Sequence, residues 1–158
     1  MLISTGHVRR LMFCSEYPDD KLEHFTRYLA ESEAMVWALG MVPKFADFQR
    51  VVQRGTAGLG GGRTDGERIM ILSGELDELM DVPMTQQLAM RYRNTVRDVT
   101  GEKVLHVSCD VEYVEEKYTE DRGNGVRMVI VKGSGHHVQN DLQWEVGAER
   151  IEDFLQQL

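Results

Sequence analysis

The stretch Arg68-Ile69-Met70-Ile71-Leu72-Ser73-Gly74 decides the fold class of this 158-residue chain. A short, unbroken apolar run that ends in glycine is typical of a strand buried on both faces of a parallel sheet. A second run of this kind, Val126-Arg127-Met128-Val129-Ile130-Val131, occurs later in the chain. Helical patterns follow both runs, so we expect an α/β domain with at least two parallel strands.

The expected helices are read from apolar residues that recur at three and four positions. One helix opens at Asp81-Val82-Pro83, and a last helix begins near Asn140 or Asp141. The spacing between Pro18 and Arg54 predicts at least two further helices. The apolar side of the last helix is expected to carry Leu142, Val146, Ile151, Phe154 and Leu155.

We divide the chain into three segments. Residues 1–54 form a helical segment, residues 55–66 a glycine-rich linker, and residues 67–158 the α/β portion. Six of the twelve linker positions counted from Gly55 to Gly66 are glycine, and their backbone freedom opposes a helix or strand there. Residues 100–124 are the least regular, and we interpret them as an insertion with a solvated acidic face at residues 112–121.

Charge and composition exclude several classes of function. A net charge of −8 argues against a nucleic-acid partner, because such affinity is built on Lys and Arg. No apolar run approaches the roughly 20 residues that span a bilayer, and no signal peptide is recognisable, so we expect a cytosolic location. Cys14 and Cys109 belong to no disulfide or zinc pattern, and the glycine-rich stretch lacks the spacing of a phosphate-binding loop. We expect no metal and no cofactor.

Two polar turns follow the two predicted strands. The first strand runs into Gly74-Glu75-Leu76-Asp77, and the second into Gly133-Ser134-Gly135-His136-His137. Catalytic groups collect beyond the carboxyl ends of parallel strands, where the loops converge. A buried carboxylate that fixes the tautomer of an imidazole makes that imidazole an effective general base. Asp77 and His136 are therefore the candidate catalytic residues.

The order of these motifs resembles the last third of an α/β-hydrolase. In that superfamily the triad follows the chain order serine, acid, histidine. The run from Lys132 to Glu145, with its Gly-Ser-Gly-His-His core, is similar to a fungal-type branch of the superfamily. The resemblance implies that Asp77 is the triad acid and His136 the triad base. It also implies serine hydrolysis of a small-molecule ester, thioester or related acyl substrate.

The same resemblance gives a role to the helical segment at residues 1–54. α/β-Hydrolases insert a lid or cap ahead of the acid strand, and this segment is similar to such a cap. The residues that the cap resemblance directs toward the substrate pocket are Trp37, Met41 and Phe45. At helical spacing such residues belong more often to an ordinary core, and only the cap resemblance gives the pocket interpretation equal weight, so both interpretations stay open.

The nucleophile of an α/β-hydrolase has no counterpart in this sequence. It requires Gly-x-Ser-x-Gly on a sharp strand-to-helix turn, and none of the six serines lies in that context. One hypothesis is that the chain contributes Asp77 and His136 to a site completed elsewhere. The alternative is a truncated, non-catalytic remnant that acts through protein association. A small sheet with an exposed edge near Ile69–Leu72 would favour such self-association.

Two residues also have simpler interpretations. Asp77 taken alone could only cap the turn that follows it, and the pairing with His136 carries the catalytic inference. His137 has no third ligand at a suitable spacing, so we interpret it as a neighbour that packs or hydrogen-bonds rather than a metal ligand.

Overall fold

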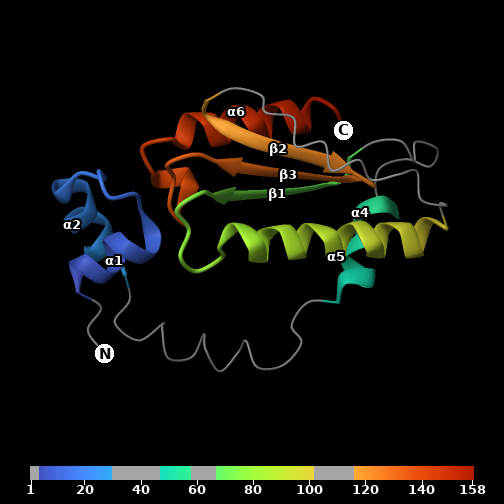
Figure 1. Cartoon of the computed structure of the whole chain (residues 1–158), viewed down its shortest axis with the longest axis horizontal. Helices are drawn as coiled ribbons and strands as arrows, with labels where there is room; N and C mark the ends of the chain where they lie inside the picture. Colours follow the sequence, from blue (N-terminus) through green and yellow to red (C-terminus); the bar gives the residue numbers. More distant parts are fainter. Residues whose placement is uncertain (1–3, 30–46, 58–66, 102–115) are drawn as a thin grey trace.

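The computed structural model describes residues 4–29, 47–57, 67–101 and 116–158, and Figure 1 shows their arrangement. They form a small mixed sheet with helices on both faces (Figure 1). In chain order the elements are α1 (Thr5–Met12), α2 (Asp19–Arg27), α4 (Phe48–Ala57), β1 (Ile69–Gly74), α5 (Val82–Thr100), β2 (Tyr118–Gly123), β3 (Val126–Val131), the 3-10 turn η1 (Val138–Asn140) and α6 (Trp144–Leu155).

The sheet has the strand order β1-β3-β2. β1 and β3 run parallel, with Ile69 opposite Val126 and Gly74 opposite Val131. This confirms the two predicted strands and their parallel pairing. β2 runs antiparallel to β3 and was not predicted. The result is compatible with an α/β domain, although the described sheet is small.

β2 corrects the interpretation of residues 118–121 as part of a solvated acidic face, while residues 112–115 of that predicted face lie outside the described residues. Glu120 and Asp121 lie in this strand and are buried. Burial of a carboxylate requires a paired charge, and both side chains have one. Asp121 Oδ2 accepts from Arg93 Nη1 of α5 at 2.8 Å, and Glu120 pairs with Arg122. Polar residues therefore occupy buried positions of β2. The apolar residues that would predict a strand from the sequence are absent at these positions.

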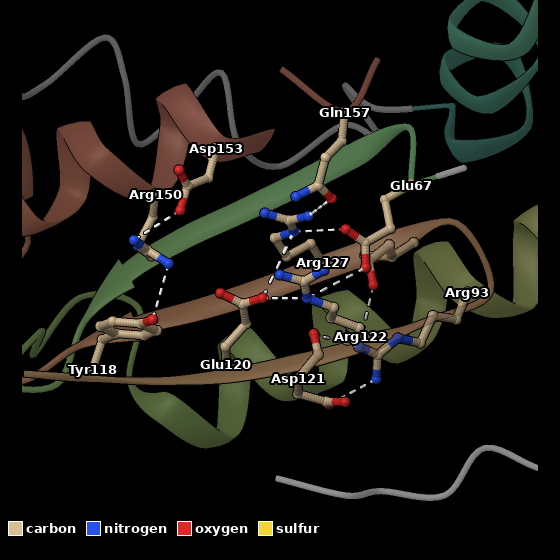
Figure 2. A network of polar contacts seen from close by, with 11 residues as sticks. Glu67, Arg93, Tyr118, Glu120, Asp121, Arg122, Arg127, Arg150, Asp153 and Gln157 are labelled. Atoms are coloured by element: carbon tan, nitrogen blue, oxygen red, sulfur yellow. Dashed lines mark hydrogen bonds and ion pairs between the residues drawn. The ribbon is translucent and has the colours of Figure 1, made fainter. Parts of the chain in front are cut away.

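Arg127, in the middle of the sheet, is fully buried and lies at the centre of a polar network (Figure 2). Its Nε donates to Glu67 Oε2 at 2.6 Å, and its Nη2 donates to Gln157, just beyond α6. The guanidinium also lies 5.5 Å from the ring centroid of Phe154. These contacts join the end of α6 to the start of β1, so the C-terminal helix is attached to the sheet by charge as well as by apolar contacts.

The two faces of the sheet are covered by different helices. Met128 and Ile130 of β3 pack with Ala89 of α5, and Val129 and Val131 pack on the other face with Val138 of η1. Alternate residues of a strand point to opposite faces, which explains this division. Figure 1 accordingly shows α5 and α6 on opposite sides of the sheet.

Several helix boundaries differ from the predictions. α4 continues through Gly55 to Ala57, so the first residues of the predicted linker at 55–66 are helical. Val52 of α4 packs in one core cluster with Val96 of α5 and Val126 of β3, so α4 shares the hydrophobic core of the sheet. α6 begins at Trp144, a few residues later than expected, because η1 occupies residues 138–140.

α1 was not predicted from the sequence. Ser4 caps its N-terminus by accepting from the His7 amide, and Val8 is its buried residue. α1 and α2 pack on one another around Val8, Phe13 and Leu22. Figure 1 shows the pair at the end of the sheet toward which the β1 and β3 arrows point. The helices therefore stand at the edge where the candidate site is expected.

Candidate active site

The turns after β1 and β3 are joined directly by hydrogen bonds. The Leu76 amide donates to the Ser134 carbonyl oxygen at 2.8 Å, and the Gly133 amide donates to Glu75 Oε2 at 3.0 Å. A Cβ atom on Gly74 would overlap the carbonyl oxygens of Ser134 and Gly135. Only glycine allows the two turns to approach this closely, and the approach sets the separation of the residues that follow.

Asp77 and His136 meet at this junction. His136 Nδ1 lies 2.8 Å from Asp77 Oδ2. The Asp77 side chain is 3% exposed and the His136 side chain 32%, so the acid is enclosed while part of the imidazole faces solvent. Asp77 Oδ1 accepts from the Leu79 and Met80 amides, both at 2.8 Å. Each carboxylate oxygen thus has its own partners, which fixes the plane of the carboxyl group.

This geometry determines the tautomer of His136. An ionised carboxylate only accepts hydrogen bonds, so the proton lies on Nδ1 and Nε2 keeps its lone pair. No group of the described residues hydrogen-bonds Nε2. Asp77 would also stabilise the imidazolium that forms when Nε2 takes up a proton. The arrangement of the pair is one that can act as a general base. Asp77 also caps the Leu79–Met80 turn, so the structural role and the pairing coexist in one side chain.

Asp141 accepts hydrogen bonds from the turn that carries His136. This buried carboxylate accepts from the Gly135 amide at 2.7 Å and from the Cys14 amide at 2.9 Å through Oδ2. Oδ1 accepts from the Leu142 amide at 2.8 Å. Ser134 Oγ lies 3.4 Å from Oδ2. One side chain thereby joins the turn that carries His136 to the segment after α1.

His137 connects the same turn to α1 and α2. Its ring lies against Phe13 and Phe25, with centroid distances of 5.9 and 5.2 Å. Its amide donates to the Met12 carbonyl oxygen at 2.8 Å, and its Nδ1 lies 2.9 Å from Asn140 Nδ2. Burial and the neighbouring His136 lower the pKa of His137, which favours its neutral form. Within the described residues no cluster of His, Cys, Asp or Glu could hold a metal ion.

Cys14 lies beside Asp141 and is buried. Burial, followed by the hydrogen bond to the Asp141 carboxylate, raises the pKa of the Cys14 thiol to about 11. A thiol with this pKa is almost entirely protonated at neutral pH, and the thiolate is the nucleophilic form. The geometry therefore does not make Cys14 an activated nucleophile.

None of the serines in the described part of the chain is hydrogen-bonded to His136. Ser4 Oγ lies 2.7 Å from His7 Nδ1, and Ser15 Oγ donates to Glu16. Ser73 accepts from Thr85, and Ser134 is fully buried in the turn that carries His136.

Of the predicted site residues, the structure brings Asp77 and His136 together, while Trp37, Met41 and Phe45 lie outside the described residues.

Asp141 is the residue of this site that reasoning from the sequence missed. It was interpreted only as the start of the last helix. Its partner Cys14 is 127 positions away, and no local pattern signals a contact over that separation. Phe13 and Phe25 were missed for the same reason.

Comparison of the chain with models of known protein families, with curated proteins and with solved structures finds no match. None of the helices that the structure describes has the length and apolar character of a bilayer-spanning segment.

Proposed function

We propose that this chain carries the acid and base of a serine-hydrolase site of the α/β-hydrolase type, with Asp77 as the acid and His136 as the base. The parent reaction is hydrolysis of an ester, thioester or related acyl group. The observation that carries the proposal is the 2.8 Å contact between Asp77 and His136 at the carboxyl ends of two adjacent parallel strands. No cofactor is needed for this chemistry.

In the proposed reaction His136 Nε2 accepts the proton of the attacking hydroxyl, and the hydroxyl oxygen bonds to the acyl carbon. The bond between the acyl carbon and the leaving group then breaks, and the proton passes from Nε2 to the leaving group. With a serine supplied from outside this sequence, the first product is an acyl ester that water hydrolyses in a second cycle. Without a serine, His136 can only activate water, and a positioned general base typically contributes about 10²–10⁴-fold. The isolated chain is thus expected to be a very weak esterase.

Hydrolysis of p-nitrophenyl acetate by the purified chain tests the role of the pair. The expected result is a rate that falls at least about tenfold in His136→Ala and in Asp77→Asn, because both changes remove the basic Nε2. His24→Ala, which removes an exposed imidazole from α2, is the matched control and should keep the wild-type rate. Equal rates in wild type and His136→Ala would overturn the proposal.

The missing nucleophile needs a separate test. A fluorophosphonate probe reacts with activated serines, and mass spectrometry locates the label. We expect no serine of the folded chain to be labelled. A label that disappears in His136→Ala would show that a serine of this sequence is activated, and the assignment of the nucleophile to another source would then be wrong.

A second candidate function is association without catalysis. This function is favoured because none of the described serines is hydrogen-bonded to His136. In that case Asp77 and His136 remain from a catalytic ancestor and only stabilise the junction of the two turns. Loss of folding stability without any change in esterase rate in His136→Ala would favour this candidate.

A further inference from the structure

The outer edge of β1 is one of the two edges of the described sheet. Ile69–Leu72 are apolar and only half-buried, whereas every residue of β3 is buried. No other described strand pairs with β1. An apolar edge strand with unpaired backbone groups is a template for a further strand. We propose that the outer edge of β1 pairs antiparallel with β1 of a second copy, so that two sheets join about a twofold axis.

Specific backbone groups face this edge. The Ile69 amide donates to the Gly125 carbonyl oxygen and the Glu75 amide to that of Val131. Since every second amide of a strand points toward the same neighbour, the amides of Met70 and Leu72 point away from β3. In an antiparallel pair centred on Ile71, Met70 and Leu72 of the two copies exchange hydrogen bonds, and Ile71 faces Ile71.

A second apolar surface lies on α6. Trp144, Ala148, Ile151 and Leu155 recur at four and three positions on the helix and are exposed; we refer to them as the α6 flank. The exposed fractions of its large members are 51% for Trp144, 42% for Ile151 and 60% for Leu155. Such spacing is typical of a helix seam that packs on another helix.

The α6 flank lies on the β1 side of its helix. Arg150 reaches the Tyr118 hydroxyl of β2 at 2.9 Å, and the Gly147 position lies against Leu72 of β1. Successive residues of an α-helix are rotated by about 100° about its axis, so Gly147 lies between Arg150 and Ile151 around the helix. The flank is thus directed past β1, toward the edge on which the second copy is placed.

The spacing of a joined sheet fits a contact between the two α6 helices. α6 packs across β1 and β3, and neighbouring strands lie about 4.8 Å apart. A twofold axis at the β1 edge therefore separates the two helices by about 10 Å, which is the distance of direct helix contact. The α6 flank presents no charge, so each copy offers the other a self-complementary apolar surface.

The same geometry places Ile151 near the axis. Gly147 lies at the level of Leu72, and Phe154 at the level of Arg127, which is opposite Met70. The residues between them, Arg150 and Ile151, are consequently at the level of Ile71. In the proposed dimer Ile151 meets Ile151 above the paired strands.

The amount of surface is suited to a reversible dimer. The exposed parts of Trp144, Ile151 and Leu155 amount to roughly 300 Å² per copy, because a complete large side chain buries about 150–250 Å². A stable interface buries about 800 Å² per partner. The paired β1 edges and the exposed parts of Met70 and Leu72 add to this area. Since the two β1 strands pair antiparallel, the two Asp77–His136 sites lie at opposite ends of the joined sheet. Each copy therefore has a complete Asp77–His136 pair of its own.

Cysteine crosslinking tests the register. Facing residues of a non-hydrogen-bonded antiparallel pair have Cα atoms about 4.5 Å apart, within the range that a disulfide spans. Ile71→Cys should therefore form a covalent dimer under mild oxidation. Leu72→Cys is the matched control, because it faces Met70 of the other copy and should form little. Equal crosslinking of both variants, or none in Ile71→Cys, would overturn the proposed register.

Sedimentation velocity at protein concentrations from about 1 to 200 µM tests the dimer itself. Wild type should form dimers, and Ile151→Glu should weaken association by at least about 100-fold, since it places two like charges together at the axis. Met70→Pro should have a similar effect by removing an edge amide that β3 does not use. Met90→Glu changes an exposed apolar residue of α5, 57% exposed, and should leave the dimer intact. A wild-type monomer at 200 µM, or loss of the dimer in Met90→Glu alone, would overturn the proposal.

Discussion

Replacement of Asp141 by alanine should weaken the attachment of α1 and α2 to the rest of the molecule. The carboxylate accepts from the amides of Gly135, Cys14 and Leu142, and it is buried. A hydrogen bond to a charged group contributes about 1.5–3 kcal/mol, and the contributions of one group are not additive. Asp141→Ala leaves at least two buried amides without an acceptor, so we expect a loss of about 3–5 kcal/mol in the free energy of unfolding.

Urea denaturation followed by circular dichroism measures this loss. Asp141→Asn is the matched control, because its one remaining carbonyl oxygen can still accept from Gly135 and Cys14, and we expect it to lose less. Hydrogen exchange gives an independent reading: the Cys14 and Gly135 amides should exchange faster in Asp141→Ala than in wild type. A loss below about 1 kcal/mol together with unchanged exchange at both amides would refute the role given to Asp141.

Three other predictions follow from the same junction. Gly74→Ala should prevent the two turns from meeting and abolish the cooperative thermal transition. Gly6→Ala should leave the transition intact, because the atom nearest to the added Cβ is Ser4 Oγ at 3.9 Å. Equal transitions in both variants would contradict the steric argument. The pKa of Cys14 is raised from 9.0 to about 11, so this thiol should resist iodoacetamide at pH 8 in the folded protein. Its contribution to stability should be complete below pH 9 and be lost as the pH rises toward 11. Rapid alkylation without unfolding would be inconsistent with this prediction. His137, with a pKa lowered from 6.5, should contribute stability that is complete above pH 6.5 and is lost as the pH falls through its folded-state pKa, and a proton NMR titration that gives His137 a pKa above 6.5 would disprove the assignment.

The sequence predicted the parts of the fold that depend on local patterns. The runs 69–74 and 126–131 could be recognised as strands because a strand covered on both faces of a sheet is mostly apolar, and β3 is buried along its whole length. The meeting of Asp77 and His136 could be predicted because adjacent parallel strands bring their carboxyl ends to one edge. In both cases the signal lies within a few residues of the structure it specifies.

The features that were missed depend on contacts between distant residues. β2 contains Glu120 and Asp121, which read as exposed until Arg93, in α5, is placed beside Asp121. α1 has only eight residues, and such a short helix is marginal without tertiary contacts. Its stabilising contacts come from Gly135, whose Cβ position lies 2.7 Å from the Phe13 backbone, and from Asp141. No local pattern contains these pairings.

Nitrogen-15 NMR of the His136 imidazole is the most direct test of the central claim that Asp77 prepares this ring as a base. Spectra of wild type and Asp77→Asn above pH 8 report which ring nitrogen carries the proton. We expect protonated Nδ1 and unprotonated Nε2 in wild type, and a change of this tautomer in Asp77→Asn. A wild-type ring with its proton on Nε2 would rule out a base role for His136, because that nitrogen could not then accept a proton from an attacking hydroxyl.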